Sequence, residues 1–468
     1  MRNPRITRRE FVGVAAATTA MVRGSGRGPL VAATRPNVLF ILADDLGYGD
    51  LSCYGRPDYQ TPVLDAFARQ GVKFMSAYAA APVCTPTRCA YITGRYHQRL
   101  AVGLEEPLKA SSPPDVGLPP GHPTIASLLK ANGYDTSLVG KWHLGWKPEF
   151  GPNRHGFDEF FGTLSGAGDY FTHKAADMRG AALGAPGGLP DLWENLTPVD
   201  RVGYLTDLLT DRAVDIVGRP HAKPFFLSLQ YSAPHAPWEG PEDAAISHTD
   251  HGPGPMTKGG SLAIYGAMVK SMDAGIGRVL KALERSKLER DTLVIFTSDN
   301  GGERYSFNWP FSFAKGYLWE GGTRVPAMFR WPGVIPPGQV TEQAAITMDW
   351  TATILAATGT AADPAYPLDG EDLLPVCRGT KAAYDRTLFW RVAEYDSARM
   401  GRWKYLKESD KEHLFDLSVD PGEKSDVRAA HPDTFDEVRR RYLAWNAQML
   451  PKLGRPPTTA DTIGAPAE

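Results

Sequence analysis

The segment CTPTRCAYITGR, residues 84–95, places a cysteine, a proline and an arginine at a spacing that suits anion chemistry. A proline in the first turn of a helix loses no hydrogen bond, because the N–H groups of that turn have no partner within the helix. We therefore predict that a helix begins at Cys84. Arg88 then lies one turn further along the same face, and the free N–H groups of a first turn favour an anion. The alternative is a disulfide bond between Cys84 and Cys89.

Two pairs of oxygen-bearing side chains each follow an apolar segment. The pairs are Asp44 with Asp45, after NVLFILA, and Asp299 with Asn300, after TLVIFTS. Three carboxylates and one amide form a set of hard oxygen ligands that is costly to bury without a cation. Oxygen ligation favours Ca²⁺ or Mg²⁺ over Zn²⁺, and a mostly protein-built set favours Ca²⁺ over Mg²⁺. The alternative is two unrelated strand ends that carry capping carboxylates.

Basic side chains occur at four further places in the chain. Lys141 and His143 lie two residues apart on a segment predicted to be extended, so they would point to the same side. His235 lies between the prolines of APHAPW, and Lys315 opens the glycine-containing segment KGYLWEGGTRVP. Each of these alone is an ordinary solvated or satisfied side chain. Together with Arg88 they would surround a bound cation with positive charge and hold a polyanionic ester group.

Alternating strands and helices must position these side chains. Continuous apolar runs rich in aromatic and β-branched residues predict buried strands at 37–43, 224–232 and 292–298. Helical patterns lie between them, such as TPVLDAFARQG and YGAMVKSMDAGIGRVLKALERSK. This alternation predicts an α/β fold with helices on both faces of a parallel sheet. Ligands of such sheets bind beyond the carboxyl ends of the strands, where the polar pairs lie.

The first 33 residues have the pattern of an export signal. An arginine-rich start precedes an apolar stretch at 11–22 that is too short to span a bilayer, and small residues follow at 31–33. The order TRREFV at residues 7–12 resembles a twin-arginine signal, and the alternative is an ordinary secretory signal. We predict a periplasmic or secreted protein with no membrane span, since no later apolar run is long enough.

Composition and charge exclude some classes of binding partner and of fold. Without residues 1–33, which contain six arginines and one glutamate, the formal charge changes from -2 to -7. This balance argues against a nucleic-acid partner. Four cysteines are too few for a disulfide scaffold in a chain of 468 residues. The length is enough for one large and one smaller domain.

The sequence predicts a smaller domain in the C-terminal part. A predicted helix in MDWTATILAATG is followed by TLFWRVAEY and GRWKYLKE, whose alternation of apolar and polar residues predicts antiparallel strands. The segment PDTFDEVRRRYLAWNAQML predicts a closing helix. A Gly- and Pro-rich stretch at 248–260 predicts a mobile loop. The predicted organisation is a signal peptide at 1–33, a catalytic domain at 34–375, a small α+β subdomain at 376–450 and a disordered tail at 451–468.

At this point the residues resemble the sulfatases, a family of the alkaline phosphatase superfamily. The family's first signature, C-x-P-x-R followed by an aliphatic residue and T-G, is matched from Cys84 to Gly94. Its second signature, G-Y-x-(S/T) followed by G-K-x-x-H, is matched from Gly133 to His143. Further segments in the family's order are PNVLFILADDLGYGDLSCYG, GFDEFFG, APHAPW, SDNGG, KGYLWEGGTRVPAMFRWPG and LFDLSVDPGEKSD. The resemblance spans roughly residues 36–445 and implies a large mixed, mostly parallel sheet with a smaller C-terminal antiparallel sheet.

The resemblance also implies a chemistry. Cys84 would be oxidised by a formylglycine-generating enzyme to an aldehyde, whose hydrate attacks the sulfur of a sulfate monoester of an aryl alcohol or a carbohydrate. Asp44, Asp45, Asp299, Asn300 and the modified Cys84 would ligate Ca²⁺. Arg88 and Lys141 would stabilise the hydrate and the sulfate oxygens, His143 would be the base that releases sulfate, Lys315 would also contact sulfate, and His235 with Lys315 would assist the leaving oxygen.

Two other functions stay open at this stage. A phosphodiester or phosphonate monoester hydrolase can use the same fold and the same aldehyde. A non-catalytic glycan-binding protein on this fold is a second alternative, although the complete set of site residues argues against it. The sequence does not identify the alcohol part of the substrate, because Trp146, Trp238 and Trp319 suit core packing as well as ring stacking.

Overall fold

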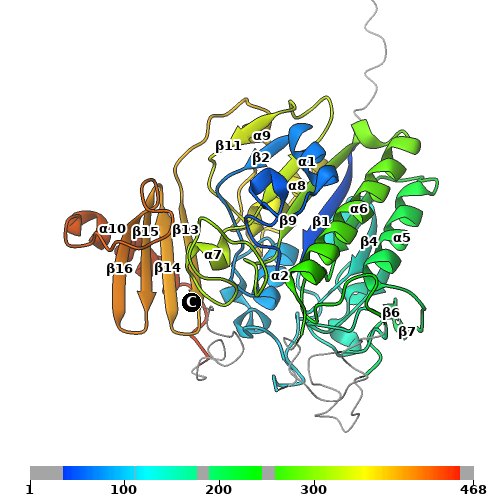
Figure 1. Ribbon diagram of the computed structural model, residues 1–468, viewed down its shortest axis with the longest axis horizontal. Coiled ribbons are helices and arrows are strands. Elements are labelled where there is room, and N and C mark those ends of the chain that lie inside the picture. Colours follow the sequence, from blue (N-terminus) through cyan, green and yellow to red (C-terminus); the bar gives the residue numbers. More distant parts are fainter. Residues whose placement is uncertain (1–34, 110, 176–188, 245–258, 454–468) are drawn as a thin grey trace, which may run out of the picture. The chain divides into compact units, whose positions relative to one another are not determined.

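The computed structural model of the protein describes residues 35–109, 111–175, 189–244 and 259–453 (Figure 1). The predicted export signal at 1–33 lies outside the described residues. So do most of the predicted mobile loop at 248–260 and all but the first three residues of the predicted tail. Those three predictions are therefore not addressed by the structure.

A ten-stranded mixed sheet forms the centre of the described chain, in the order β11-β2-β10-β9-β1-β8-β4-β5-β6-β7. Its middle, from β9 to β5, is parallel, and antiparallel strands are added on both sides. The predicted mixed, mostly parallel sheet is confirmed. The strands are β1 Asn37–Ala43, β2 Val72–Phe74, β4 Asp135–Gly140, β5 Glu159–Gly162, β6 Trp193–Glu194, β7 Thr197–Pro198, β8 Phe225–Gln230, β9 Thr292–Ser298, β10 Ala327–Arg330 and β11 Gln339–Thr341.

The register of the three central strands brings their carboxyl ends together. In β1, β8 and β9 every residue is buried, as expected of strands covered on both faces. Ala43 of β1 is the partner of Ser298 in β9, and Leu42 is the partner of Gln230 in β8. The residues that follow β1 and β9 must therefore lie side by side at one edge of the sheet.

Alternate residues of β1 pack into two separate cores, one on each face of the sheet. Leu39 and Ile41 pack with residues of α1, α5 and α6. Phe40 and Leu42 pack with residues of α2, α3 and α8 on the other face (Figure 1). The predicted helical layers on both faces are confirmed. These helices are α1 Pro62–Arg69, α2 Cys84–Thr93, α3 Ile125–Ala131, α5 Leu205–Gly218, α6 Leu262–Arg285 and α8 Thr347–Thr358.

Short elements connect these layers. They comprise a two-stranded parallel sheet, two helices of four residues and several 3-10 turns. They are β3 Ala77–Tyr78 with β12 Ala345–Ile346, α7 Glu320–Thr323, α9 Leu374–Cys377, and the turns η1 Ser52–Tyr54, η2 His97–Arg99, η3 Ala101–Leu104, η4 Pro148–Phe150, η5 Pro152–Arg154 and η7 Glu289–Asp291.

The C-terminal part forms a four-stranded antiparallel sheet, as the sequence predicts. Its strands are β13 Thr387–Val392, β14 Tyr395–Met400, β15 Trp403–Glu408 and β16 Lys411–Asp416. The helix α10, Pro432–Asn446, buries Val438, Tyr442 and Trp445 against this sheet. The domain boundary at 375 stays a prediction.

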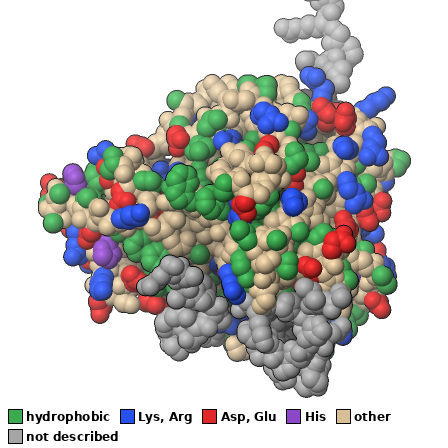
Figure 2. Space-filling model, in the orientation of Figure 1, with side chains coloured by type: hydrophobic (Ala, Val, Ile, Leu, Met, Phe, Trp, Pro, Cys, Tyr) green, Lys and Arg blue, Asp and Glu red, His purple; other side chains and the backbone are tan. Residues whose placement is uncertain are grey.

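The face of the molecule drawn in Figure 2 carries Lys, Arg, Asp and Glu side chains of both signs intermixed. On α5 and α6 such charges pair directly, for example Arg278 with Asp211. Within the described residues, no helix has both the length and the apolar character that crossing a membrane requires.

Candidate active site

Asp44 and Asp299 lie side by side because they follow the neighbouring strands β1 and β9. Both carboxylates are fully buried and share the guanidinium of Arg88. Arg88 Nη2 lies 2.9 Å from Asp299 Oδ2 and 3.4 Å from Asp44 Oδ2. Lys141, directly after β4, forms an ion pair with Asp44 Oδ2. The structure thus brings together four predicted site residues from four separate segments.

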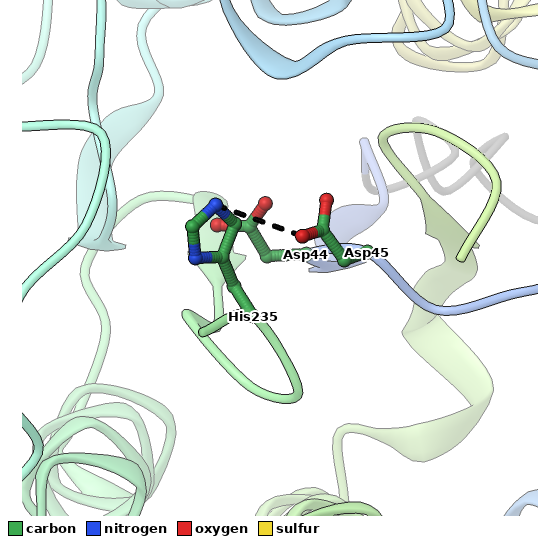
Figure 3. Close-up of side chains that lie close together, drawn as sticks. All are labelled: Asp44, Asp45 and His235. Atoms are coloured by element: carbon green, nitrogen blue, oxygen red, sulfur yellow. Dashed lines mark ion pairs between the residues drawn. The ribbon is translucent and has the colours of Figure 1, made fainter. Parts of the chain in front are cut away.

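The neighbouring carboxylate, Asp45, gathers the remaining predicted residues. Lys315 Nζ lies 2.7 Å from Asp45 Oδ2, and the Asn300 side-chain amide donates to Asp45 Oδ1 at 2.7 Å. His235 Nε2 lies 3.6 Å from Asp45 Oδ2 (Figure 3). Burial would raise the pKa of Asp45, but Lys315, His235 and Lys141 outweigh it and hold that pKa below its ordinary value. Asp45 is therefore charged.

Cys84 is the first residue of α2, as predicted, and it is 2% exposed. All four cysteines are free, so the alternative of a disulfide bond between Cys84 and Cys89 is wrong. Burial raises the pKa of the Cys84 thiol, although Lys141 and Lys315 act in the opposite sense. An unmodified thiol at this position is protonated at neutral pH and is a poor nucleophile.

His143 has the geometry of a proton acceptor. Its Nε2 donates to the carbonyl oxygen of Leu108 at 2.8 Å, which leaves Nδ1 as the unprotonated nitrogen. Nδ1 is buried and has no hydrogen-bond partner among the described residues. Burial and the nearby Lys141 hold the pKa of His143 well below its ordinary value. The ring is therefore neutral and presents a lone pair.

The prediction that Lys141 and His143 share one side of an extended segment is wrong in its cause. Strand β4 ends at Gly140, so both residues lie in the loop beyond it. His143 has a φ of 56°, in the left-handed region. Both side chains point into the site because of the conformation of this loop, and not because alternate residues of a strand point to the same side.

His235 is also neutral. The peptide bonds Ala233–Pro234 and Ala236–Pro237 on either side of it are cis. Its Nδ1 donates to the carbonyl oxygen of Ala236, so Nε2 carries the lone pair that faces Asp45. Burial and then Lys315 lower the pKa of His235 to about 3. The proton of this pair resides on Lys315, whose pKa is raised well above its usual value by Asp45 and Glu303 despite burial.

The buried oxygens at the strand ends fit a metal ion. One ligand atom from each of Asp44, Asp45 and His235 lies within 4.8 Å of the other two. Asp44 Oδ1 and Asn300 Oδ1 are buried and accept no hydrogen bond from any described residue. Burial and the charge of Asp44 raise the pKa of Asp299 to about 7. Together these observations describe two closely spaced buried carboxylates and two unpartnered acceptors, which a divalent cation would satisfy.

The group of side chains that could hold a metal ion differs from the predicted ligand set at two residues, His235 and Asp299. His235, predicted to face the leaving oxygen, lies within ligand distance of the two aspartates. Asp299 was predicted as a ligand, but both of its oxygens already accept hydrogen bonds, from Asp45 N at 3.2 Å and from Arg88.

Two site residues are absent from the sequence prediction. Gln230 ends strand β8 and accepts from Arg88 Nη1 at 2.7 Å. Glu303 Oε2 lies 3.9 Å from Lys315 Nζ, and burial raises the pKa of Glu303 to about 7. A long polar side chain at the end of a mostly apolar strand is the signal that identifies Gln230. Glu303 has only its place after SDNGG as a signal.

The fold and this group of buried charges define an α/β protein of the alkaline-phosphatase-like type, with a site that suits an anionic ester. The family model described as Sulfatase matches residues 36–360, and the model described as N-sulphoglucosamine sulphohydrolase, C-terminal, matches residues 308–442. The chain belongs to the sulfatase family, and its class is that of the sulfuric ester hydrolases.

Individual relatives agree with this membership. The chain is 37% identical to the steryl-sulfatase of Mus musculus, over 94% of this chain and 87% of that protein. It is 31% identical to the N-acetylgalactosamine-6-sulfatase of Sus scrofa, over 92% and 90%. Among solved structures, Ps i-CgsB in complex with k-i-k-neocarrahexaose matches with a TM-score of 0.78 and 31% identity, over 92% of this chain and 96% of that chain.

Proposed function

We propose that this sulfatase hydrolyses its sulfate monoester through an aldehyde hydrate at residue 84 and a bound Ca²⁺. The observation that carries the proposal is the set of buried, unpartnered acceptors at Asp44 and Asn300, surrounded by the cations Arg88, Lys141 and Lys315. Such a set is stabilised by a divalent cation and an anionic substrate together.

The environment of Cys84 supports its modification. A buried thiol with a raised pKa is unsuited to nucleophilic attack, whereas the hydrate of an aldehyde supplies a hydroxyl nucleophile. The formylglycine-generating enzyme is the partner that this maturation requires. Export as a folded protein by a twin-arginine signal at residues 1–33 to the periplasm, or beyond it, belongs to the same proposal.

The cation would be held by oxygen ligands from two strand ends and from residue 84. The proposed ligands are Asp44, Asp45, Asp299, Asn300 and the modified Cys84. Oxygen donors and a mostly protein-built shell favour Ca²⁺. When bound, the cation supplies positive charge beside the nucleophile and the sulfate oxygens. His235 is a further candidate ligand because of its distance to the two aspartates.

The charge balance of the site suits a singly charged substrate. The carboxylates Asp44, Asp45 and Asp299 oppose the cations Arg88, Lys141 and Lys315, so the protein groups alone nearly neutralise one another. A divalent cation then leaves a net positive site. A sulfate monoester carries one negative charge and complements it.

The basic residues have separate roles in this proposal. Arg88 and Lys141 orient the sulfate oxygens, which requires that the cation takes over part of their present bonding to Asp44 and Asp299. The unprotonated Nδ1 of His143 accepts the proton whose removal releases sulfate. Lys315 contacts sulfate and donates a proton to the leaving oxygen, and His235 assists at the same oxygen, since the proton of this pair resides on Lys315.

A direct experiment compares 4-nitrophenyl sulfate with 4-nitrophenyl phosphate and a phenyl phosphonate monoester. The protein is produced with a formylglycine-generating enzyme and assayed before and after removal of divalent cations by a chelator. We expect a preference for the sulfate ester that is lost on chelation and restored by Ca²⁺. A preference for either phosphorus ester, or full activity after chelation, would contradict the proposal.

A further inference from the structure

A cavity of about 650 Å³ lies between the segment 104–113 and two turns of the C-terminal sheet. One turn, residues 393–394, joins β13 to β14, and the other, residues 409–410, joins β15 to β16. We propose that this cavity is the subsite for the alcohol part of the ester and that it accepts a polyhydroxylated, sugar-like alcohol. This inference rests on the proposed function, because it assigns the substrate class of the same site.

The wall of the cavity is also a wall of the active site. Pro107 and Lys109 line the cavity, and Leu108 between them accepts from His143 Nε2 at 2.8 Å. The backbone N–H of Leu108 donates to Thr85 Oγ1 at 3.1 Å, and Thr85 is the neighbour of Cys84. A single backbone segment therefore contacts both the proposed base and the start of α2.

The lining offers one buried hydrogen-bond acceptor that lacks a donor among the described residues. Glu394 lines the cavity, and its Oε2 is buried without a hydrogen-bond partner among the described residues. A buried carboxylate oxygen left without a donor is costly, so this atom calls for a hydroxyl or amine of a ligand, or for water. Nearby, Glu106 Oε2 accepts from the backbone N–H of Ala393 at 2.8 Å, which holds the turn of Glu394 against the segment 104–113.

The character of the lining distinguishes a sugar from an apolar ring system. Charged side chains of both signs line the cavity, including Glu105, Lys109, Arg391, Lys407 and Asp410. No aromatic side chain is among the described residues that line it. Its volume lies within the range of about 300–1,000 Å³ that is usual for ligand sites, but such sites are usually lined mainly by apolar groups. Hydroxyl groups can form hydrogen bonds with a lining of this kind, whereas the apolar rings of a steroid cannot.

A second cavity, of about 440 Å³, is the main competitor for this role. Four arginines line it, among them Arg399 and Arg402. It opens beside the turn that joins β14 to β15, at the opposite end of the antiparallel strands from the turn of Glu394. It lacks the connection through Leu108 to the active site, so we do not assign the alcohol to it.

Glu394→Ala tests the subsite directly. The probes are 4-nitrophenyl sulfate, estrone sulfate, and a panel of hexoses and amino-hexoses that carry one sulfate group. For the matured protein without a substitution, we expect kcat/KM for the best panel sugar to exceed that for estrone sulfate by at least about tenfold. In Glu394→Ala the KM of that sugar should rise about tenfold with kcat unchanged, whereas the constants for 4-nitrophenyl sulfate should stay the same. Glu437→Ala removes a half-buried carboxylate on α10 outside the cavity and is the matched control.

A bulky residue in the cavity provides a second, independent test. Ser111 lines the cavity and is exposed, so Ser111→Trp should fold normally and block the sugar while 4-nitrophenyl sulfate is still hydrolysed. Equal effects of both variants on sugar and aryl sulfates, or a preference for estrone sulfate, would overturn the subsite while the proposed function stands. No turnover of any sulfate ester by the matured protein would overturn the proposed function as well.

Discussion

Two of the clusters of buried charge among the described residues differ in how completely their acceptors are paired. The first contains the site residues Asp44, Asp45, Asp299, Arg88, Lys141 and Lys315. The second, here called the junction cluster, contains Glu320, Lys404, Glu423, Tyr78 and Arg324, and it joins α7 to the C-terminal sheet. Lys404 Nζ lies 2.9 Å from Glu320 Oε1 and 2.7 Å from Glu423 Oε1.

The junction cluster contains one carboxylate of low pKa and one of raised pKa. Glu320 Oε2 accepts from Tyr78 at 2.6 Å and lies 3.1 Å from Arg324. Burial alone would raise the pKa of Glu320, but Lys404 and Arg324 lower it to about 2. Burial raises the pKa of Glu423 to about 7.

The site shows the same division but differs in its acceptors. The pKa of Asp45 is held below its ordinary value, and burial with Asp44 raises the pKa of Asp299 to about 7. Asp44 Oδ1 and Asn300 Oδ1 have no hydrogen-bond partner among the described residues, whereas Glu423 Oε1 lies 2.7 Å from Lys404 Nζ. Acceptors without a cation beside them, and not burial itself, distinguish the site from the junction cluster.

The largest expected effect on turnover comes from replacing the proposed nucleophile in the site. Cys84→Ala removes the residue that is to be modified, so turnover of any sulfate ester should fall by at least about 10³-fold. The melting temperature should change little, because the removed atom forms no disulfide. The measurement is the initial rate with 4-nitrophenyl sulfate, alongside Cys89→Ala as a control in the same helix. Activity in Cys84→Ala close to that of the control would exclude residue 84 as the nucleophile.

The next effect concerns the surplus of acceptors. Asp44→Asn keeps the shape of the side chain and removes one negative charge, so the affinity for Ca²⁺ should fall about 100-fold or more. Thermal unfolding across a series of Ca²⁺ concentrations measures this, because a ligand of the folded state raises the melting temperature. Glu320→Gln, the matched change in the junction cluster, should lower the melting temperature and leave the Ca²⁺ response intact. If Ca²⁺ no longer raised the melting temperature of either Asp44→Asn or Glu320→Gln, the proposed difference between the site and the junction cluster would be wrong.

A smaller and more selective effect is expected at Lys315. If Lys315 does not donate a proton, an alkyl or sugar alcohol is a poor leaving group, whereas an activated phenol stabilises the negative charge on its own oxygen. Lys315→Ala should therefore reduce turnover of a sugar sulfate about 10²-fold further than that of 4-nitrophenyl sulfate. His235→Ala should show the same selectivity to a lesser degree. A uniform loss across leaving groups would assign these residues to binding or to the cation instead of to proton donation.

The smallest effect on turnover belongs to the junction cluster. Lys404→Met leaves Glu320 and Glu423 buried without their shared cation, which should cost about 3–5 kcal/mol of unfolding free energy. Denaturant unfolding measures that loss. The rate per folded molecule should stay within about twofold, since Lys404 is not part of the site. An unchanged unfolding free energy in Lys404→Met would show that the ion pairs of the junction cluster do not stabilise the fold. A large loss of turnover per folded molecule would show that this cluster contributes to catalysis.

The sequence predicts the central strands well, for physical reasons. Strands β1 and β9 lie where the apolar runs lie, because both faces of each strand are covered and apolar side chains fill its middle. The ends of these strands fix Asp44 and Asp299 side by side. By contrast, the short strands β2 and β11 pair at one side of the sheet without an apolar signal of their own, since three residues are too few for periodicity.

Tertiary contacts explain what the sequence does not reveal. His235 reaches ligand distance of the aspartates only through the fold of its loop. The unprotonated nitrogen of His143 depends on the Leu108 carbonyl, 35 residues away in the chain. Gln230 belongs to the site because it accepts from Arg88, which is distant in the sequence. Glu303 belongs to it because it lies near Lys315, from which a loop separates it in the sequence. Spacing alone does not encode which partner a side chain meets.

The central claim is that residue 84 acts as an aldehyde and not as a thiol. Its most direct test is peptide mass spectrometry of the segment around residue 84, on the same preparation whose turnover of 4-nitrophenyl sulfate has been measured. We predict that the active fraction matches the fraction of peptide that carries the aldehyde, across preparations made with different amounts of the formylglycine-generating enzyme. Full activity in protein whose residue 84 is entirely an unmodified cysteine would contradict the account.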